Sequence, residues 1–160
     1  MRRVREFCFM KQALEAIHFH YLVPSFHFPN RNHLKTFLFS QLLKEDKEIE
    51  AINYIFCDDD YLLSINQQYL RHDTLTDIVT FELSVKDQPL LSDIYISVER
   101  IKENASIFNV SFSKELHRVV FHGALHLAGY KDKKKNDQKI MRRKENEWLE
   151  LYFVPRSTVS

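Results

Sequence analysis

Glycine is scarce in this sequence. Gly123 and Gly129 are the only two among 160 residues, whereas average usage would give about eleven. Both lie in the stretch H-G-A-L-H-L-A-G-Y-K-D, residues 122–132. Gly123 falls inside an expected helix, where glycine costs roughly 1 kcal/mol relative to alanine, and such a residue usually marks a close approach to the backbone. The scarcity therefore directs attention to this stretch.

The sequence also has few cysteines, no long apolar runs and little net charge. Cys8 and Cys57 form no C-x-x-C pair, and such sparse use fits a reducing compartment, although the two could pair. No stretch approaches the ~18 apolar residues of a membrane span, and charged residues interrupt any apolar signal-peptide core near the N-terminus. The net charge of +1 gives no general argument for a nucleic-acid partner. We expect a soluble cytoplasmic protein without membrane association.

The pattern of apolar residues predicts a single α+β domain. With 44% hydrophobic residues, the chain is long enough to bury one sizeable core. Alternating or β-branched segments predict about four strands, at 17–21, 49–57, 77–83 and 91–96, with a turn at 87–89 that could join the last two as a hairpin. Helical spacing and capping residues predict about five helices, at 31–44, 58–70, 97–108, 111–128 and 136–152. We interpret the acidic triplet 58–60 as a helix cap, in preference to a metal loop. The expected fold is a mixed sheet packed with helices, with the histidine helix at its centre.

The two histidines of the glycine-bearing stretch are spaced for one metal ion. His122 and His126 lie four residues apart, about 40° around a helix axis, so their imidazoles project the same way. Two ring nitrogens so placed can reach one tetrahedral cation about 2.0–2.1 Å from each. Gly129 can end the helix in the left-handed conformation, and the turn can bring Asp132 back as a third ligand. Two histidines and one carboxylate leave a fourth zinc position open, as in a catalytic site.

Positive charge is concentrated directly after these histidines. Residues 131–144 hold eight basic side chains against Asp132 and Asp137. A run of this kind is often only a solvated face. Next to a metal site, however, it is also what an RNA substrate would favour, because phosphates bind lysine and arginine. The lysines nearest the histidines, Lys133, Lys134 and Lys135, are the substrate-binding candidates.

Several motifs together resemble one known family. The stretch H-G-A-L-H-L-A-G-Y is similar to the metal-binding motif of the YbeY family of bacterial rRNA maturation endoribonucleases. The segments N-Q-Q-Y at 66–69, D-T-L-T-D-I-V-T-F at 73–81 and S-D-I-Y-I at 92–96 resemble further family motifs in the same order. The resemblance covers roughly 16–153. We therefore expect the enzyme domain at 16–153, an N-terminal appendage at 1–15 and a C-terminal tail at 154–160.

The resemblance implies a function and a set of site residues. It implies one zinc ion per chain, a single-strand-selective endoribonuclease activity, and a role in ribosomal RNA maturation and ribosome quality control. The implied partners are a ribosomal RNA precursor and the small ribosomal subunit. Asp132 stands where the family has a third histidine, so His122, His126 and Asp132 form the expected ligand set.

A second departure from the family concerns an arginine. The family places it directly after the N-x-x-Y tyrosine, where this chain has Leu70 followed by Arg71. Arg71 is the candidate for stabilising the phosphoryl transition state. The two positions would be equivalent only if a bulge or an end-of-helix turn lay there. The matching pair Thr76 and Asp77 would orient a ligand histidine, shape the cleft, or simply form a turn.

Two other functions compete with this one. The departures at residues 70 and 132 are compatible with a ribosome-associated assembly factor whose metal is mainly structural. A small metallopeptidase would share the histidine spacing, but such enzymes place a glutamate after the first histidine as general base. Gly123 occupies that position here, which argues against a peptidase.

Overall fold

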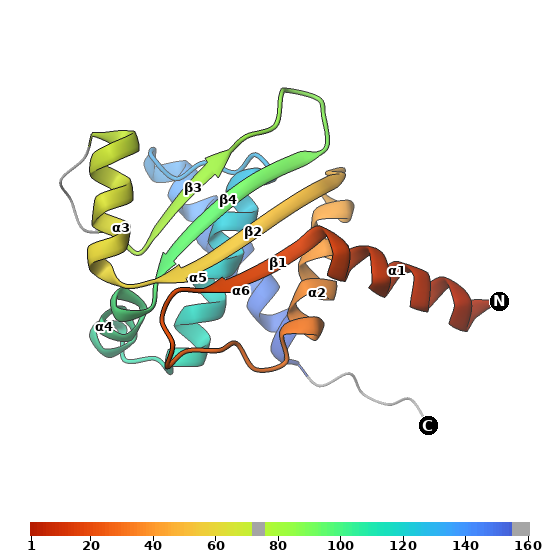
Figure 1. Cartoon of the computed structure of the whole chain (residues 1–160), viewed down its shortest axis with the longest axis horizontal. Coiled ribbons are helices and arrows are strands. Elements are labelled where there is room, and N and C mark those ends of the chain that lie inside the picture. Colours follow the sequence, from red (N-terminus) through yellow and green to blue (C-terminus); the bar gives the residue numbers. More distant parts are fainter. Residues whose placement is uncertain (72–75, 155–160) are drawn as a thin grey trace.

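Six α-helices and one four-stranded sheet make up the described part of the chain, residues 1–71 and 76–154 of a computed structural model (Figure 1). The strands are β1 (Ile17–Tyr21), β2 (Ile49–Cys57), β3 (Ile78–Glu82) and β4 (Leu90–Ser97). The helices are α1 (Arg2–Ala16), α2 (Arg31–Lys44), α3 (Asp59–Ile65), α4 (Val98–Phe108), α5 (Phe112–Leu127) and α6 (Lys135–Phe153), and a π-helical turn, η1 (Asn66–Leu70), follows α3. The family-like residues 73–75 and most of the expected tail, 155–160, lie outside the described residues.

The sheet is mixed, as predicted. Its strand order is β1-β2-β4-β3. The first two pairs run parallel, and β3 pairs with β4 antiparallel as the predicted hairpin. This order makes β3 an edge strand beside the helix that carries the histidines.

Different helices pack on the two faces of the sheet. Alternate residues of β2 and β4, among them Tyr54, Phe56 and Ile94, face the main core with α2, α5 and α6. These three helices lie behind the sheet in Figure 1. On the opposite face, α3 covers a smaller apolar cluster that contains Cys57 and Val79. Both groupings follow from the period of two in a strand.

Helix starts follow the predicted capping chemistry. Asp58, Ser97 and Ser111 each accept a hydrogen bond from the backbone N–H three residues on. Each cap satisfies an N–H group that the first helical turn leaves unpaired. The acidic triplet 58–60 therefore serves as a cap and first turn, as interpreted from the sequence.

Two elements differ from the prediction. The first 15 residues, to which we assigned no structure, contain α1, which projects from the body in Figure 1. Its buried residues are Ala13 and Ala16, near its C-terminal end, so its sequence has little of the apolar periodicity that reveals a packed helix. The helix expected at 58–70 is α-helical only to Ile65 and then widens into η1.

Gly123 allows α5 to lie against the sheet. A Cβ atom at this position would stand 2.9 Å from Ile78 Cδ1 and 3.2 Å from Ile94 Cγ2. The expected close approach to the glycine backbone is thus confirmed, and it brings the histidine face of α5 next to β3. No helix in residues 1–71 or 76–154 combines the length and the apolarity needed to cross a bilayer.

Candidate metal centre and its cleft

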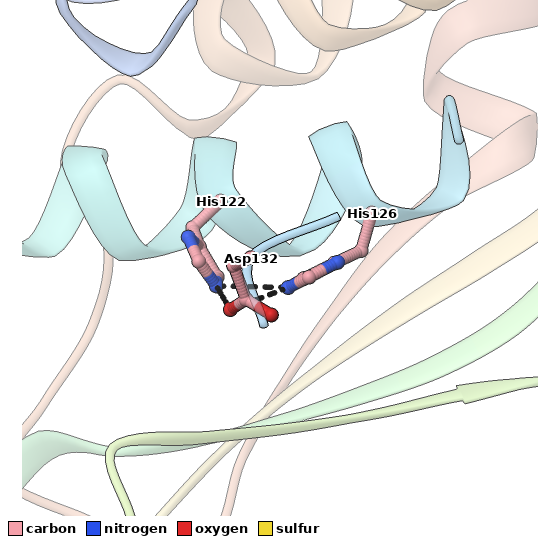
Figure 2. Close-up of side chains that lie close together, drawn as sticks. All are labelled: His122, His126 and Asp132. Atoms are coloured by element: carbon pink, nitrogen blue, oxygen red, sulfur yellow. Dashed lines mark hydrogen bonds and ion pairs between the residues drawn. The ribbon is translucent and has the colours of Figure 1, made fainter. Parts of the chain in front are cut away.

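His122, His126 and Asp132 converge on one point beside α5 (Figure 2). The two Nε2 atoms are 3.0 Å apart, and each lies 3.2 Å from Asp132 Oδ2. Both imidazoles project from the same side of the helix, as their four-residue spacing predicts. The aspartate comes from the loop that returns after the helix ends.

The return of the chain depends on Gly129. This residue has φ of 105°, and Tyr130 N–H donates across it to Leu125 C=O at 3.0 Å. The left-handed glycine and the six-to-one hydrogen bond are those of a Schellman ending. The predicted turn is confirmed, and it places Asp132 beside His126.

Hydrogen bonds on the far side of each ring select its tautomer. His126 Nδ1 lies 2.9 Å from the carbonyl oxygen of Tyr130, and His122 Nδ1 lies 2.7 Å from Glu145 Oε1. Carbonyl and carboxylate oxygens accept, so both Nδ1 atoms carry the proton. In this tautomer, the Nε2 lone pair of each ring points toward Asp132.

This donor set fits a divalent metal ion. Two lone pairs and a carboxylate oxygen that face one another at 3.0–3.2 Å repel unless a cation lies among them. Ligands of a tetrahedral zinc ion stand about 3.3 Å apart when each bond is about 2.0–2.1 Å. His122, His126 and Asp132 can therefore hold such an ion and leave one position open.

Glu145 is the functional residue that the sequence reasoning missed. It lies on α6 with 3% of its side chain exposed. Its Oε1 accepts from His122, and its Oε2 pairs with Arg118 at 3.3 Å and Arg142 at 3.1 Å. Arg118 also donates to Glu115, with Nε 2.9 Å from Oε2. Burial alone would raise the pKa of Glu145, but the bond from His122 and the charge of Arg118 lower it below its usual value.

A signal for Glu145 was present in the sequence. Met141, Glu145, Trp148 and Leu149 are the buried residues of α6, and their spacing places them on one helical face. An acidic residue on an otherwise apolar face needs a partner. The sequence alone did not show that this partner was His122.

Tyr130 anchors the turn that carries the acceptor for His126. Its hydroxyl donates to Glu45, with oxygens at 3.1 and 3.2 Å. Lys144 pairs with the same carboxylate at 3.1 Å and lies 5.6 Å from the centre of the tyrosine ring. Tyr130 also packs against the main core, so the position of the turn is fixed on both sides.

The three candidate ligands line a cleft of about 640 Å³. One wall is α5 with the loop after it, and the facing wall is β3 with the residues before it. Asn66 and Leu70 of η1 also line the cleft. The lining residues on the β3 side are Thr76, Asp77, Ile78, Val79, Thr80 and Glu82.

Asp77 is a half-buried carboxylate in this wall. Its Oδ2 accepts from Asn104 Nδ2 at 3.2 Å. Burial raises its pKa, although the nearby charge of Arg118 opposes the rise. The carboxyl group therefore keeps its proton to a higher pH than an exposed aspartate would. Of the three roles considered for Thr76 and Asp77, shaping the cleft agrees with their position.

The arginine candidate does not line the cleft. Leu70 does, whereas Arg71 is an exposed residue with φ of 54° that ends η1. For Arg71 to replace the family's arginine, which aligns with Leu70, an end-of-helix turn was required here, and the structure has one. The structure therefore meets the backbone condition for Arg71 but does not place its side chain among the lining residues.

The predicted lysines lie between the cleft and the start of α6. Lys133 lines the cleft, Lys134 precedes α6 as its N-cap, and Lys135 begins the helix. Asp137, the other acidic residue of the basic run, lies in the first turn of α6, where a carboxylate complements the helix dipole. His117 does not join the site: it is buried against Phe28 and Tyr152, and burial lowers its pKa.

Comparisons with known proteins agree on one family. The family profile described as "Endoribonuclease YbeY" matches residues 29–152. A protein of that name from Flavobacterium psychrophilum is 55% identical over 118 residues, covering 74% of this chain and 84% of its own. Another from Flavobacterium johnsoniae is 47% identical, covering 81% and 92%. The solution structure of a Thermotoga maritima protein, 30% identical, superposes with a TM-score of 0.58 over 85% of this chain and 88% of that one.

Proposed function

This chain belongs to the YbeY endoribonuclease family, and we propose that it is a zinc-dependent, single-strand-selective endoribonuclease. One observation supports the proposal: His122, His126 and Asp132 converge at a cleft, and the Nε2 atoms of both histidines lie where they could bind one cation. In this proposal the enzyme acts in the cytoplasm on precursor ribosomal RNA at the small subunit. Its role there is 3′-end processing of small-subunit rRNA and ribosome quality control. The catalytic domain is residues 16–153, and 1–15 and 154–160 lie outside it.

In this proposal some residues hold the zinc ion and its ligands in place, and others bind the RNA. A zinc ion in this site would stabilise charge on a phosphoryl oxygen and increase the acidity of a water molecule. Glu145 and the carbonyl of Tyr130 hold the two imidazoles in the tautomer that this requires. Lys133 lies where it can contact a phosphate of an RNA strand in the cleft. Lys134 and Lys135 would contact phosphates beyond it, and Arg71 would stabilise the phosphoryl transition state.

The packing at Gly123 weighs against a peptidase. A side chain there would meet Ile78 and Ile94, so position 123 faces the sheet and not the metal. A glutamate general base at this position, as in zinc peptidases, would not fit without moving α5 away from β3.

One assay separates the candidate functions. The protein, purified without a polyhistidine tag, is incubated with unstructured RNA or with casein, with and without a chelator. We expect RNA cleavage that the chelator abolishes, no casein cleavage, and about one zinc per chain by elemental analysis. The double variant H122A/H126A should lose both the zinc and the cleavage.

Two results would contradict the proposal. Zinc-loaded protein that binds ribosomal RNA without cutting any RNA would point to an assembly factor with a structural metal. Full zinc content in H122A/H126A would show that these histidines are not the ligands.

A further inference from the structure

The solvent face of α6 carries two parallel rows of polar side chains. Residues four apart on a helix lie above one another, so Lys135, Lys139 and Arg143 form one row, and Gln138, Arg142 and Asn146 form the other. All six line one shallow groove of about 810 Å³ along the helix. We call this surface the α6 groove.

The α6 groove has more positive charge than its surroundings neutralise. Lys135, Lys139 and Arg143 are exposed, and no carboxylate in residues 1–71 or 76–154 lies within 4.0 Å of their charged nitrogens. Arg142 pairs with Glu145, a carboxylate that Arg118 already shares. The groove therefore presents cations that remain available to an anion.

The positive stretch has a defined end. Continuing each row by four residues reaches Glu147 and Glu150, which line the far end of the same groove. With a rise of 1.5 Å per residue, the distance from Lys135 to Arg143 is about 12 Å along the axis, with a cation about every 6 Å. This length and spacing suit a short segment of an extended polyanion better than a single small anion.

The near end of the α6 groove points back to the metal centre. Lys133 lines the cleft of the three ligands, and Lys133 and Lys134 line a depression beside Asp132. Lys135 follows as the first residue of α6. Three consecutive lysines, 133–135, thus lead from the cleft to the start of α6.

We infer that the α6 groove binds the sugar-phosphate backbone of an RNA strand whose adjoining segment lies in the cleft. This inference rests on the proposed function and assigns Lys139, Arg142 and Arg143 to substrate binding. Lysine and arginine supply the attraction for phosphates, and the side-chain amides of Gln138 and Asn146 add donors for phosphate or sugar oxygens. Such contacts position a strand without reading its sequence, so the groove contributes affinity and not base preference.

The test is the salt dependence of RNA binding. The variant K139Q/R143Q removes two cations that contact no carboxylate, and glutamine has nearly the same helix propensity as lysine and arginine. The control K11Q/K102Q removes two exposed lysines of α1 and α4, outside the groove and the cleft. The probe is a long 2′-O-methyl oligouridylate, which resists cleavage, and binding is followed by fluorescence anisotropy over a range of salt concentrations.

Each lost phosphate contact on single-stranded RNA reduces the slope of log K against log[salt] by about 0.7. We expect K139Q/R143Q to reduce the slope by about 1.4 and the control to leave it unchanged. In cleavage assays, KM should rise for long RNA and stay constant for an oligonucleotide short enough for the cleft alone.

Other results would overturn the inference in distinguishable ways. Wild-type slope in K139Q/R143Q, with RNA still bound, would show that the strand leaves the cleft elsewhere and that the groove suits an acidic protein partner instead. A wild-type protein that binds no RNA would refute the proposed function itself.

Discussion

Replacing Glu145 should weaken metal binding although this residue is not a ligand. In the wild type, Glu145 Oε1 lies 2.7 Å from His122 Nδ1 and accepts its hydrogen bond. In Glu145→Ala this acceptor is lost, so the ring is free to rotate and to carry its proton on Nε2 instead. Loss of such a partner typically lowers metal affinity by about 10- to 100-fold, which corresponds to about 1.4–2.7 kcal/mol. Arg118 keeps Glu115 as a partner, so we expect the fold to persist.

Glu145→Gln tests whether metal binding depends on the negative charge of this side chain or only on its volume. If the amide oxygen accepts from His122, the amide nitrogen faces Arg118 and Arg142, which are donors as well. If the amide turns round, its N–H₂ group faces His122 Nδ1 and favours the wrong tautomer. We therefore expect Glu145→Gln also to weaken metal binding.

The measurements are competition titrations with zinc or cobalt and ¹⁵N NMR of the histidine side chains. The NMR spectrum of the metal-free protein should show the Nδ1–H form of His122 in the wild type and a larger Nε2–H population in both Glu145 variants. The matched control is Glu147→Gln, since Glu147 lies on the same helix and pairs with Lys144 at its surface. Wild-type metal affinity in both folded Glu145 variants would refute the reasoning.

Three further predictions concern the ligand set, the arginine and the helix–sheet contact. Asp132→Asn should reduce zinc affinity strongly while Asp137→Asn leaves it near wild type, and the reverse order by the same titration would show that the third ligand is misplaced. Arg71→Ala should lower kcat more than zinc content, because its expected role is in the transition state; unchanged turnover would show that the family's arginine has no counterpart here. Gly123→Ala gains about 1 kcal/mol of helix propensity but meets Ile78 at 2.9 Å, an overpacking cost of about 1–3 kcal/mol. We expect lower stability in urea unfolding, and a more stable variant would mean that Ile78 moves aside freely.

The features that the sequence predicted well are local ones. The strand at 17–21 and the helix at 31–44 have the predicted bounds, because alternation and helical spacing are set within a few residues. Asp58, Ser97 and Ser111 cap the predicted helices for the same reason. α1 was not predicted, since a helix with little buried surface has no periodic pattern to detect.

For the site, the sequence by itself determined how the candidate ligands His122, His126 and Asp132 converge. The four-residue spacing directs His122 and His126 to one side of a helix, and the left-handed residue Gly129 returns the chain toward them. Both effects depend on backbone dihedrals alone, so they could be read without knowing what packs nearby.

Only the tertiary structure decided what surrounds those ligands. Glu145 reaches His122 from a different helix, β3 forms the facing wall of the cleft, and Gly123 sets how closely that wall approaches. The same packing directs Leu70 into the cleft and spreads the basic run over the cleft and α6. Contacts between elements distant in sequence depend on how the whole core closes, and no short stretch of residues encodes that arrangement by itself.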